Sequence, residues 1–322
     1  MNKIKFTLAV FAIFAVTAIS AQSLTDINTK FSEAAAAMGA KDFAKAATLF
    51  EQVIDEGLDV EGAEEMVLGA KKYLPQAIFV QGGAAFQKGS LDDALAKFSQ
   101  AASLAELYGE VGVLNNARTW IGRTVLKQGA DAFNNKDYAT AATIFQKGYE
   151  GNPNDTAVAL NLAMSYSEMG DYAKGNEVYQ SIIALEGENS RFDEAVARAK
   201  SEFVTYNLVR ASKSAQDKAY DEAITATEDI LAVLPANPEA MMLRLQTYNS
   251  TKNYPKVIEL GDATAAAQTD AALKSVANFL VGAAYQNSEN YGKATEYYQK
   301  VTAGDNVAAA KAQIAELAKI TK

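Results

Sequence analysis

The chain has 322 residues, with 39 acidic and 30 basic side chains, no histidine and no cysteine. Without these two residue types it lacks the usual general base, the commonest metal ligand and the Ser–His and Cys–His nucleophilic systems, so we expect no metal site and no cofactor. The net charge of −9 repels phosphate backbones, which argues against a nucleic-acid partner.

The first 21 residues have the pattern of a cleaved signal peptide. Lys3 and Lys5 precede an apolar run over residues 6–19, and the small and polar residues "SAQS" follow. The run of about 14 residues is shorter than the roughly 20 that a membrane-spanning helix needs. We therefore predict cleavage after Ala21 and export to the periplasm or the outside of the cell as a soluble protein without membrane insertion. The alternative is an uncleaved transmembrane anchor.

Seven stretches of the remaining chain share one helical pattern. Each begins with an aromatic or large residue, has a mostly small residue three positions later, and in most cases an aromatic residue four positions after that. Because offsets of three and four lie on one face of a helix, each stretch predicts a helix that packs closely on a neighbour. A second helical pattern precedes each one, so the unit is a pair of antiparallel helices. The seven stretches begin at Phe43, Leu91, Tyr138, Tyr172, Tyr220, Tyr254 and Tyr291.

This pattern resembles the tetratricopeptide repeat, a unit of about 34 residues with Gly or Ala and Tyr on its first helix and Tyr, Ala and Phe on its second. The segments "LNLAMSYSEMGDYAKGNEVYQSIIALEGEN" (160–189) and "VGAAYQNSENYGKATEYYQKV" (281–301) carry the resemblance most clearly. It extends over roughly residues 27–308. The resemblance implies an all-α fold, a right-handed superhelical α-solenoid of about seven helix pairs.

In chain order, the repeats are predicted near residues 27–60, 75–107, 122–154, 156–189, 204–236, 238–271 and 275–305. Residues 22–305 would form one solenoid, and residues 306–322, which have a single apolar stripe, would form the helix that caps its end. Three insertions of helix-forming sequence lengthen the first helix of the next repeat, and Pro75 is predicted to kink the first of these helices. The insertions lie near residues 61–74, 108–121 and 190–203.

The chain distance between the ring of the first helix and the small residue of the second differs among repeats. It is nine residues in three repeats, as from Tyr166 to Gly175, and eight in the other four, as from Phe86 to Ala94. We therefore predict that the turn between the two helices is one residue shorter in the second group.

The resemblance also implies a concave binding surface, lined by positions of the first helices that follow the small packing residue and the ring. A carboxamide both donates to and accepts from a peptide backbone, so the carboxamides that follow the ring are predicted to form a ladder that holds an extended segment. The alternative is that these residues only end exposed helices. They are Gln87, Asn134, Gln216, Asn249 and Gln286.

Other residues of the same surface are further candidates for contacts with the partner. They are Lys127, Asp131, Met164, Tyr206, Lys213, Met242, Gln246 and Phe279. We predict a non-catalytic exported scaffold or adaptor that binds a protein or an extended peptide in the concave groove. The alternative is a glycan- or small-ligand-binding subunit of an envelope complex. An enzyme that relied on carboxylates alone, as glycosidases do, would need two carboxyl groups facing each other in a cleft.

Overall fold

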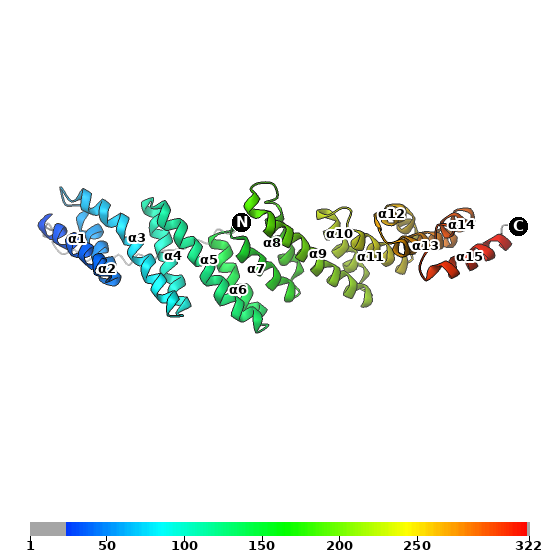
Figure 1. Ribbon diagram of the computed structural model, residues 1–322, viewed down its shortest axis with the longest axis horizontal. Helices are drawn as coiled ribbons and strands as arrows, with labels where there is room; N and C mark the ends of the chain where they lie inside the picture. The colour runs from blue at the N-terminus through cyan, green and yellow to red at the C-terminus, as the bar shows by residue number, and fades with distance from the viewer. Residues whose placement is uncertain (1–23, 321–322) are drawn as a thin grey trace. The chain divides into compact units, whose positions relative to one another are not determined.

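The computed structural model describes residues 24–320, and the predicted signal peptide of residues 1–21 lies outside the described residues. Within the described range the chain forms fifteen α-helices, one short 3-10 helix and no strand (Figure 1). None of these helices combines the length and the apolar character that crossing a membrane requires. The helices found in residues 24–320, without any strand, confirm the all-α class predicted from the sequence.

Contacts between Cα atoms divide the chain into two units, and the division runs through helix α5 (Val111–Asn134). Unit 1 ends at Asp131 and also includes Glu150–Asn152. Unit 2 comprises Ala132–Tyr149 and the chain from Pro153 onward. Because no glycine-rich or proline-rich linker stands at this place in the sequence, composition gives no sign of the division.

Unit 1 is a series of helices that each pack on the next. Helix α1 (Leu24–Gly39) packs on α2 (Phe43–Gly57), and α3 (Glu64–Gln87) packs on α2 and on α4 (Leu91–Tyr108). The core lies where the apolar faces of these helices meet. Its side chains include Ile27, Phe50, Leu74 and Ile78, all 2% exposed or less.

The helices that follow α5 repeat the same arrangement. In unit 2 each helix from α7 on packs on the next one, and each first helix of a pair also contacts the first helix of the next pair, as α7 contacts α9. The helices are α6 (Tyr138–Gly151), α7 (Thr156–Glu168), α8 (Tyr172–Ile183), η1 (Ser190–Phe192), α9 (Asp193–Gln216), α10 (Tyr220–Val233), α11 (Pro238–Ser250), α12 (Tyr254–Ala267), α13 (Ala271–Asn287), α14 (Tyr291–Gln299) and α15 (Asn306–Ile320).

The seven residues with which the sequence pattern begins are the first residues of α2, α4, α6, α8, α10, α12 and α14. The small residue three positions later lies in the seam between the helices of a pair, and Ala46, Ala141 and Ala294 are all 0% exposed. At Gly175 an added Cβ would lie 2.7 Å from the Ser167 hydroxyl oxygen, so the seam has no room for a side chain there. The predicted packing phase is therefore confirmed.

The sixth repeat keeps this packing with different residues. Val257 fills the seam position and is 0% exposed. Four residues later Gly261 stands in place of a ring, and an added Cβ there would lie 2.0 Å from a methyl carbon of Val281. The side chain of Val281 on α13 therefore occupies the space that a ring at position 261 would take.

The insertions lengthen the first helices, as predicted. Helices α3, α5 and α9 have 24 residues each, whereas α7 and α11 have 13. Helix α3 continues through Pro75.

The turns between the two helices of a repeat, by contrast, are all three residues long, so the prediction of two turn lengths is wrong. One backbone conformation explains the constant length. The middle residue of every such turn has a positive φ, whether it is glycine, as at Gly89 and Gly170, or not, as at Lys41, Lys218 and Glu289. The residue after it often caps the next helix, as Asp171 does by accepting from the backbone N–H of Lys174.

Candidate functional site

The predicted contact residues all lie on the first helices of the repeats, from Gln87 on α3 to Gln286 on α13. Gln87, Lys127 and Asp131 belong to unit 1, and the others belong to unit 2. Because the turns have equal lengths, every position can be counted back from the first residue of the following second helix. This common register shows which of the predicted residues share a face.

Counted in this way, the carboxamides occupy two registers and not one. Gln87, Asn134 and Gln216 stand four residues before the next helix, whereas Asn249 and Gln286 stand five residues before it. One residue turns an α-helix by about 100°, so the two groups point in different directions and the predicted single ladder does not form. The sequence count failed because the ring itself shifts by one position, while Ala37, Ala85, Ala132 and Ser214 take the ring's place in the shifted repeats.

Several predicted residues are already engaged within the protein. The Gln286 amide donates to Gln313 Oε1 of α15 at 2.9 Å, and its oxygen accepts from the Tyr298 hydroxyl at 2.7 Å. The Phe279 ring packs 5.4 Å from that of Tyr298. Met242 is a core residue, 6% exposed.

The remaining predicted residues lie at the surface. Gln87, Asp131, Asn134 and Gln246 are exposed, and Asn249 is half-buried. Lys127 is exposed and places its ammonium nitrogen 5.2 Å from the centre of the Phe86 ring. Lys213 and Gln216 line an open hollow on α9 together with Leu208, Val209 and Ser212.

Two predicted residues, Met164 of α7 and Tyr206 of α9, are brought together with polar partners that the sequence analysis missed. The Tyr206 hydroxyl donates to Glu168 Oε1 at 2.7 Å. Arg198 donates to the sulfur of Met164 at 3.5 Å. We call these residues of α7 and α9 the α7–α9 face: Met164, Glu168, Arg198, Glu202 and Tyr206.

Each polar group of the α7–α9 face is held by a neighbour. Arg198 Nε lies 2.7 Å from Glu202 Oε1, and the buried Tyr179 hydroxyl donates to the other oxygen of Glu202 at 3.2 Å. Burial, and then the hydrogen bond to Glu168, raise the pKa of the Tyr206 hydroxyl, so it remains a neutral donor. The face is therefore a fixed array of an aromatic ring, a thioether and paired charges, with no group poised for proton transfer.

A sequence signal for this face exists in retrospect. Arg198, Glu202 and Tyr206 recur at steps of four residues, which places them along one side of α9, and Met164 and Glu168 have the same spacing on α7. Arg198 and Glu202 belong to the third insertion, for which the sequence predicts only added helix length. The insertion in fact extends α9 alongside α7.

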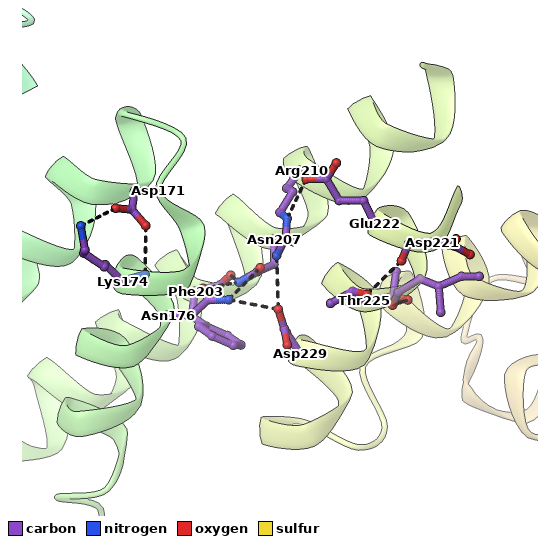
Figure 2. Close-up of polar contacts among 12 residues, drawn as sticks. Asp171, Lys174, Asn176, Phe203, Asn207, Arg210, Asp221, Glu222, Thr225 and Asp229 are labelled. Atoms are coloured by element: carbon purple, nitrogen blue, oxygen red, sulfur yellow. Dashed lines mark hydrogen bonds and ion pairs between the residues drawn. The ribbon is translucent and has the colours of Figure 1, made fainter. Parts of the chain in front are cut away.

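On its other side α9 is fixed by buried amides, as Figure 2 shows. Asn207, which is 0% exposed, donates to Asn176 Oδ1 of α8 at 2.8 Å, and Asn176 donates back to Asn207 Oδ1 at 3.2 Å. Asn176 also donates to Asp229 of α10 at 3.2 Å, and Arg210 lies 3.3 Å from the same carboxylate oxygen. Burial raises the pKa of Asp229, while Arg210 opposes that shift. These contacts join α8, α9 and α10 and set the position of α9.

Two segments of the chain match models of the tetratricopeptide repeat, residues 31–108 and residues 132–199. The solved structures to which the chain is similar include the tetratricopeptide repeat domain of P58(IPK), at 14% identity over 92% of this chain and 98% of that one, with a TM-score of 0.34. A tetratricopeptide repeat protein from Parabacteroides merdae is 12% identical over 91% of this chain and 98% of that one, with a TM-score of 0.28.

The solved structure of MamA is also similar, at 18% identity over 59% of this chain and 96% of that one, with a TM-score of 0.31. The comparison with curated proteins finds no match. The two family matches fall on helix pairs of different units, and both carry the seam alanines and the ring positions described above. Residues 31–108 and 132–199 thus belong to the tetratricopeptide repeat family.

Proposed function

We propose that the protein is an exported, non-catalytic scaffold that binds a protein or an extended peptide along the first helices of its repeats. Tetratricopeptide repeats generally serve as protein-interaction scaffolds. Export is supported by the basic, apolar and small-residue pattern of residues 1–21. The concave groove of the repeats is the proposed place of binding.

The observation that carries the proposal is the α7–α9 face. Tyr, Arg and Met are the residue types enriched at protein interfaces, and Tyr206, Arg198 and Met164 meet there. Because neighbouring side chains already hold these groups, little side-chain freedom is lost when a partner binds. Glu168 and Glu202 give the face acidic groups, which favour a partner segment that carries hydrogen-bond donors.

The proposal can be tested by capturing partners of the mature chain from the envelope fraction of its native cells. A polypeptide recovered in a fixed ratio to the protein supports the proposal, and recovery of a carbohydrate without polypeptide overturns it in favour of the glycan-binding alternative. The recovered polypeptide is then titrated by calorimetry against the variant Met164→Ala with Arg198→Ala. This variant removes the Met164 side chain and the Arg198 charge, so it should weaken binding by about tenfold or more.

Lys200→Ala is the matched control. Lys200 is also a cation of α9 in a single ion pair, with Glu186, but it is not part of the α7–α9 face. The loss of either ion pair should cost only about 0–1 kcal/mol, and thermal unfolding of both variants separates any loss of packing at the partly buried Met164 from a loss of binding. Equal affinities for the two variants would show that the partner does not use this face.

A further inference from the structure

Unit 1 has a surface pocket of about 450 Å³ between α2 and α4, with α3 beneath it. Its walls combine carboxylates, an aromatic ring and apolar side chains. The lining residues are Glu51, Ile54 and Asp55 of α2, Leu74 of α3, and Gln100, Ser103, Leu104 and Tyr108 of α4. This pocket lies on second helices, whereas the binding surface expected from the sequence lies on first helices.

The two carboxylates of the pocket, Glu51 and Asp55, stand one turn apart on α2. Among residues 24–320, neither forms a hydrogen bond or an ion pair with another residue. Burial and then the charge of Asp55 raise the pKa of Glu51, and the smaller effect of the Lys97 charge only partly opposes them. The field inside the pocket is therefore negative.

The pKa of Tyr108, on the opposite wall of the pocket, responds to the same negative charges. Burial raises the pKa of its hydroxyl first, and the charges of Asp55 and Glu51 raise it further. The ammonium nitrogen of Lys71 lies 5.9 Å from the centre of this ring. Neither Lys71 nor Lys97 forms an ion pair with Glu51 or Asp55 within the described chain.

The floor of the pocket is apolar. Ile54 is 6% exposed and Leu74 is 2% exposed, and Leu104 is partly buried beside them. A carboxylate pair above an apolar floor suits a side chain that has a long apolar stem and a cationic head. Lysine and arginine are the two residues with this construction.

A carboxylate pair above an apolar floor is not a general property of the repeat, as the equivalent pocket of unit 2 shows. It lies beside α12, where Asp262, Ala265 and Ala266 have the same spacing from the helix start as Glu51, Ile54 and Asp55 have on α2. Both oxygens of Asp262 lie 2.9 Å from the Tyr297 hydroxyl.

Two cations of the protein itself, Lys274 and Lys300, also line the pocket of unit 2, and Ala266 stands where unit 1 has Asp55. The pocket of unit 2 thus has its one carboxylate engaged and its own ammonium groups nearby. A cation from another molecule would gain little there and would be repelled by Lys274 and Lys300.

We propose that the pocket of unit 1 receives a lysine or arginine side chain of a partner polypeptide. The cationic head lies between Glu51 and Asp55, the stem covers Ile54 and Leu74, and the Tyr108 ring closes one side. Gln100 and Ser103 supply oxygen acceptors at the rim. The inference rests on the proposed function, in that the basic side chain belongs to a bound polypeptide.

The test uses the mature chain with ¹³C-labelled isoleucine, leucine and alanine methyl groups. The probes are the blocked peptides Ac-Ala-Ala-Lys-Ala-Ala-NH2, its arginine counterpart and a norleucine counterpart that keeps the apolar stem without the charge. Lysine and arginine peptides should shift the methyl signals of Ile54 and Leu104 saturably, with a Kd that is roughly millimolar for one side chain. The Ala265 methyl of the unit 2 pocket should not move.

The variant Glu51→Gln with Asp55→Asn keeps the size of both side chains and removes their charge. Its Kd for the lysine peptide should rise by about tenfold or more. The control Glu33→Gln with Glu61→Gln removes two exposed charges elsewhere in unit 1 and should bind as the parent does. Equal binding of the norleucine peptide, or an unchanged Kd in the Glu51 and Asp55 variant, would overturn the assignment.

The two proposals fail separately. If a polypeptide is captured from the envelope but no basic peptide shifts the Ile54 methyl, the pocket assignment is wrong and the proposed function stands. If basic peptides bind in the pocket but only carbohydrate is captured, the proposed function is wrong and the cation site stands without a polypeptide partner.

Discussion

The pocket beside α2 in unit 1 and the pocket beside α12 in unit 2 occupy equivalent places in the repeat, yet they have opposite chemistry. In unit 1, Glu51 and Asp55 have no ion-pair partner in the described chain and stand over an apolar floor. In unit 2, Asp262 is held by Tyr297, and Lys300 lines the pocket. The buried lining residues also differ, since Ile54 and Leu74 form an apolar floor in unit 1, whereas Ala265, Ser275 and Asn278 are buried in the pocket of unit 2.

This difference indicates which positions of a repeat protein can carry a binding function. The seam residues, such as Ala46 and Ala294, are the same in both units because they must let two helices approach closely. Positions at the rim of the seam are under no such constraint. A binding site can therefore be built in one repeat and omitted from another without altering the fold.

The largest effects are expected at the shared seam, where both units should respond alike. Ala46→Leu in unit 1 and Ala141→Leu in unit 2 each place extra methyl groups in a filled seam and should cost about 1–3 kcal/mol of unfolding free energy. Ala44→Leu and Ala139→Leu, at exposed positions of the same helices, should cost little. Denaturant unfolding of the four variants checks this. A seam variant as stable as its control would mean that the two units do not share one packing.

The next largest effect concerns the carboxamides of unit 2. Asn134 and Gln216 share one register, and replacing both by alanine should weaken partner binding by about tenfold, since each net hydrogen bond contributes roughly 0.5–1.5 kcal/mol. Gln286→Ala should instead lower stability, because Gln313 and Tyr298 lose their partner. Calorimetry with the captured partner and thermal unfolding separate the two outcomes. Reduced affinity in Gln286→Ala at unchanged stability would contradict the assigned registers.

A smaller effect sharpens the comparison of the pockets directly. The variant Ala266→Asp with Lys274→Gln and Lys300→Gln gives the unit 2 pocket a free carboxylate and removes its own cations. The lysine peptide should then shift the Ala265 methyl, with an affinity within about tenfold of unit 1, weaker because the apolar floor is missing. Absence of any shift would mean that carboxylates alone do not explain the unit 1 pocket.

The smallest effect is the pH dependence of peptide binding in unit 1. Because the folded-state pKa of Glu51 is raised by burial and by Asp55, Glu51 takes up a proton at a higher pH than an ordinary glutamate does. Only the ionised form attracts a cation, so affinity should be full at neutral pH and should fall as the pH drops towards that raised pKa. In Glu51→Gln this step should vanish. A parent profile that matches that of Glu51→Gln would contradict the role of Glu51.

The helix pairs could be predicted from sequence because each depends on residues close together in the chain. Phe43 and Tyr172 begin their helices as expected, and the alanine or glycine three positions later lies in the seam. The prediction of two turn lengths fails because the count begins at the ring, which lies one position nearer the turn at Phe86 than at Tyr166, while the turn itself keeps one length.

The sites were harder to predict because they combine side chains that are distant in sequence. Met164 meets Arg198 across two helices, and Glu51, Leu74 and Tyr108 meet across three. A register error of one residue is enough to assign such groups to the wrong face, which is what happened to the carboxamides. Helical spacing gives the face of each helix but not the partner that lies opposite.

The claim that exposed, non-repeating residues bind a polypeptide is tested most directly by photo-cross-linking in the native cells. A benzophenone amino acid is placed singly at Ser103 beside the unit 1 pocket, at Gln216 on the first-helix surface, and at Ala266 in the unit 2 pocket. We predict a polypeptide adduct of one common size from Ser103 and from Gln216, and none from Ala266. Adducts from Ala266 alone, or from none of the three positions, would contradict the claim.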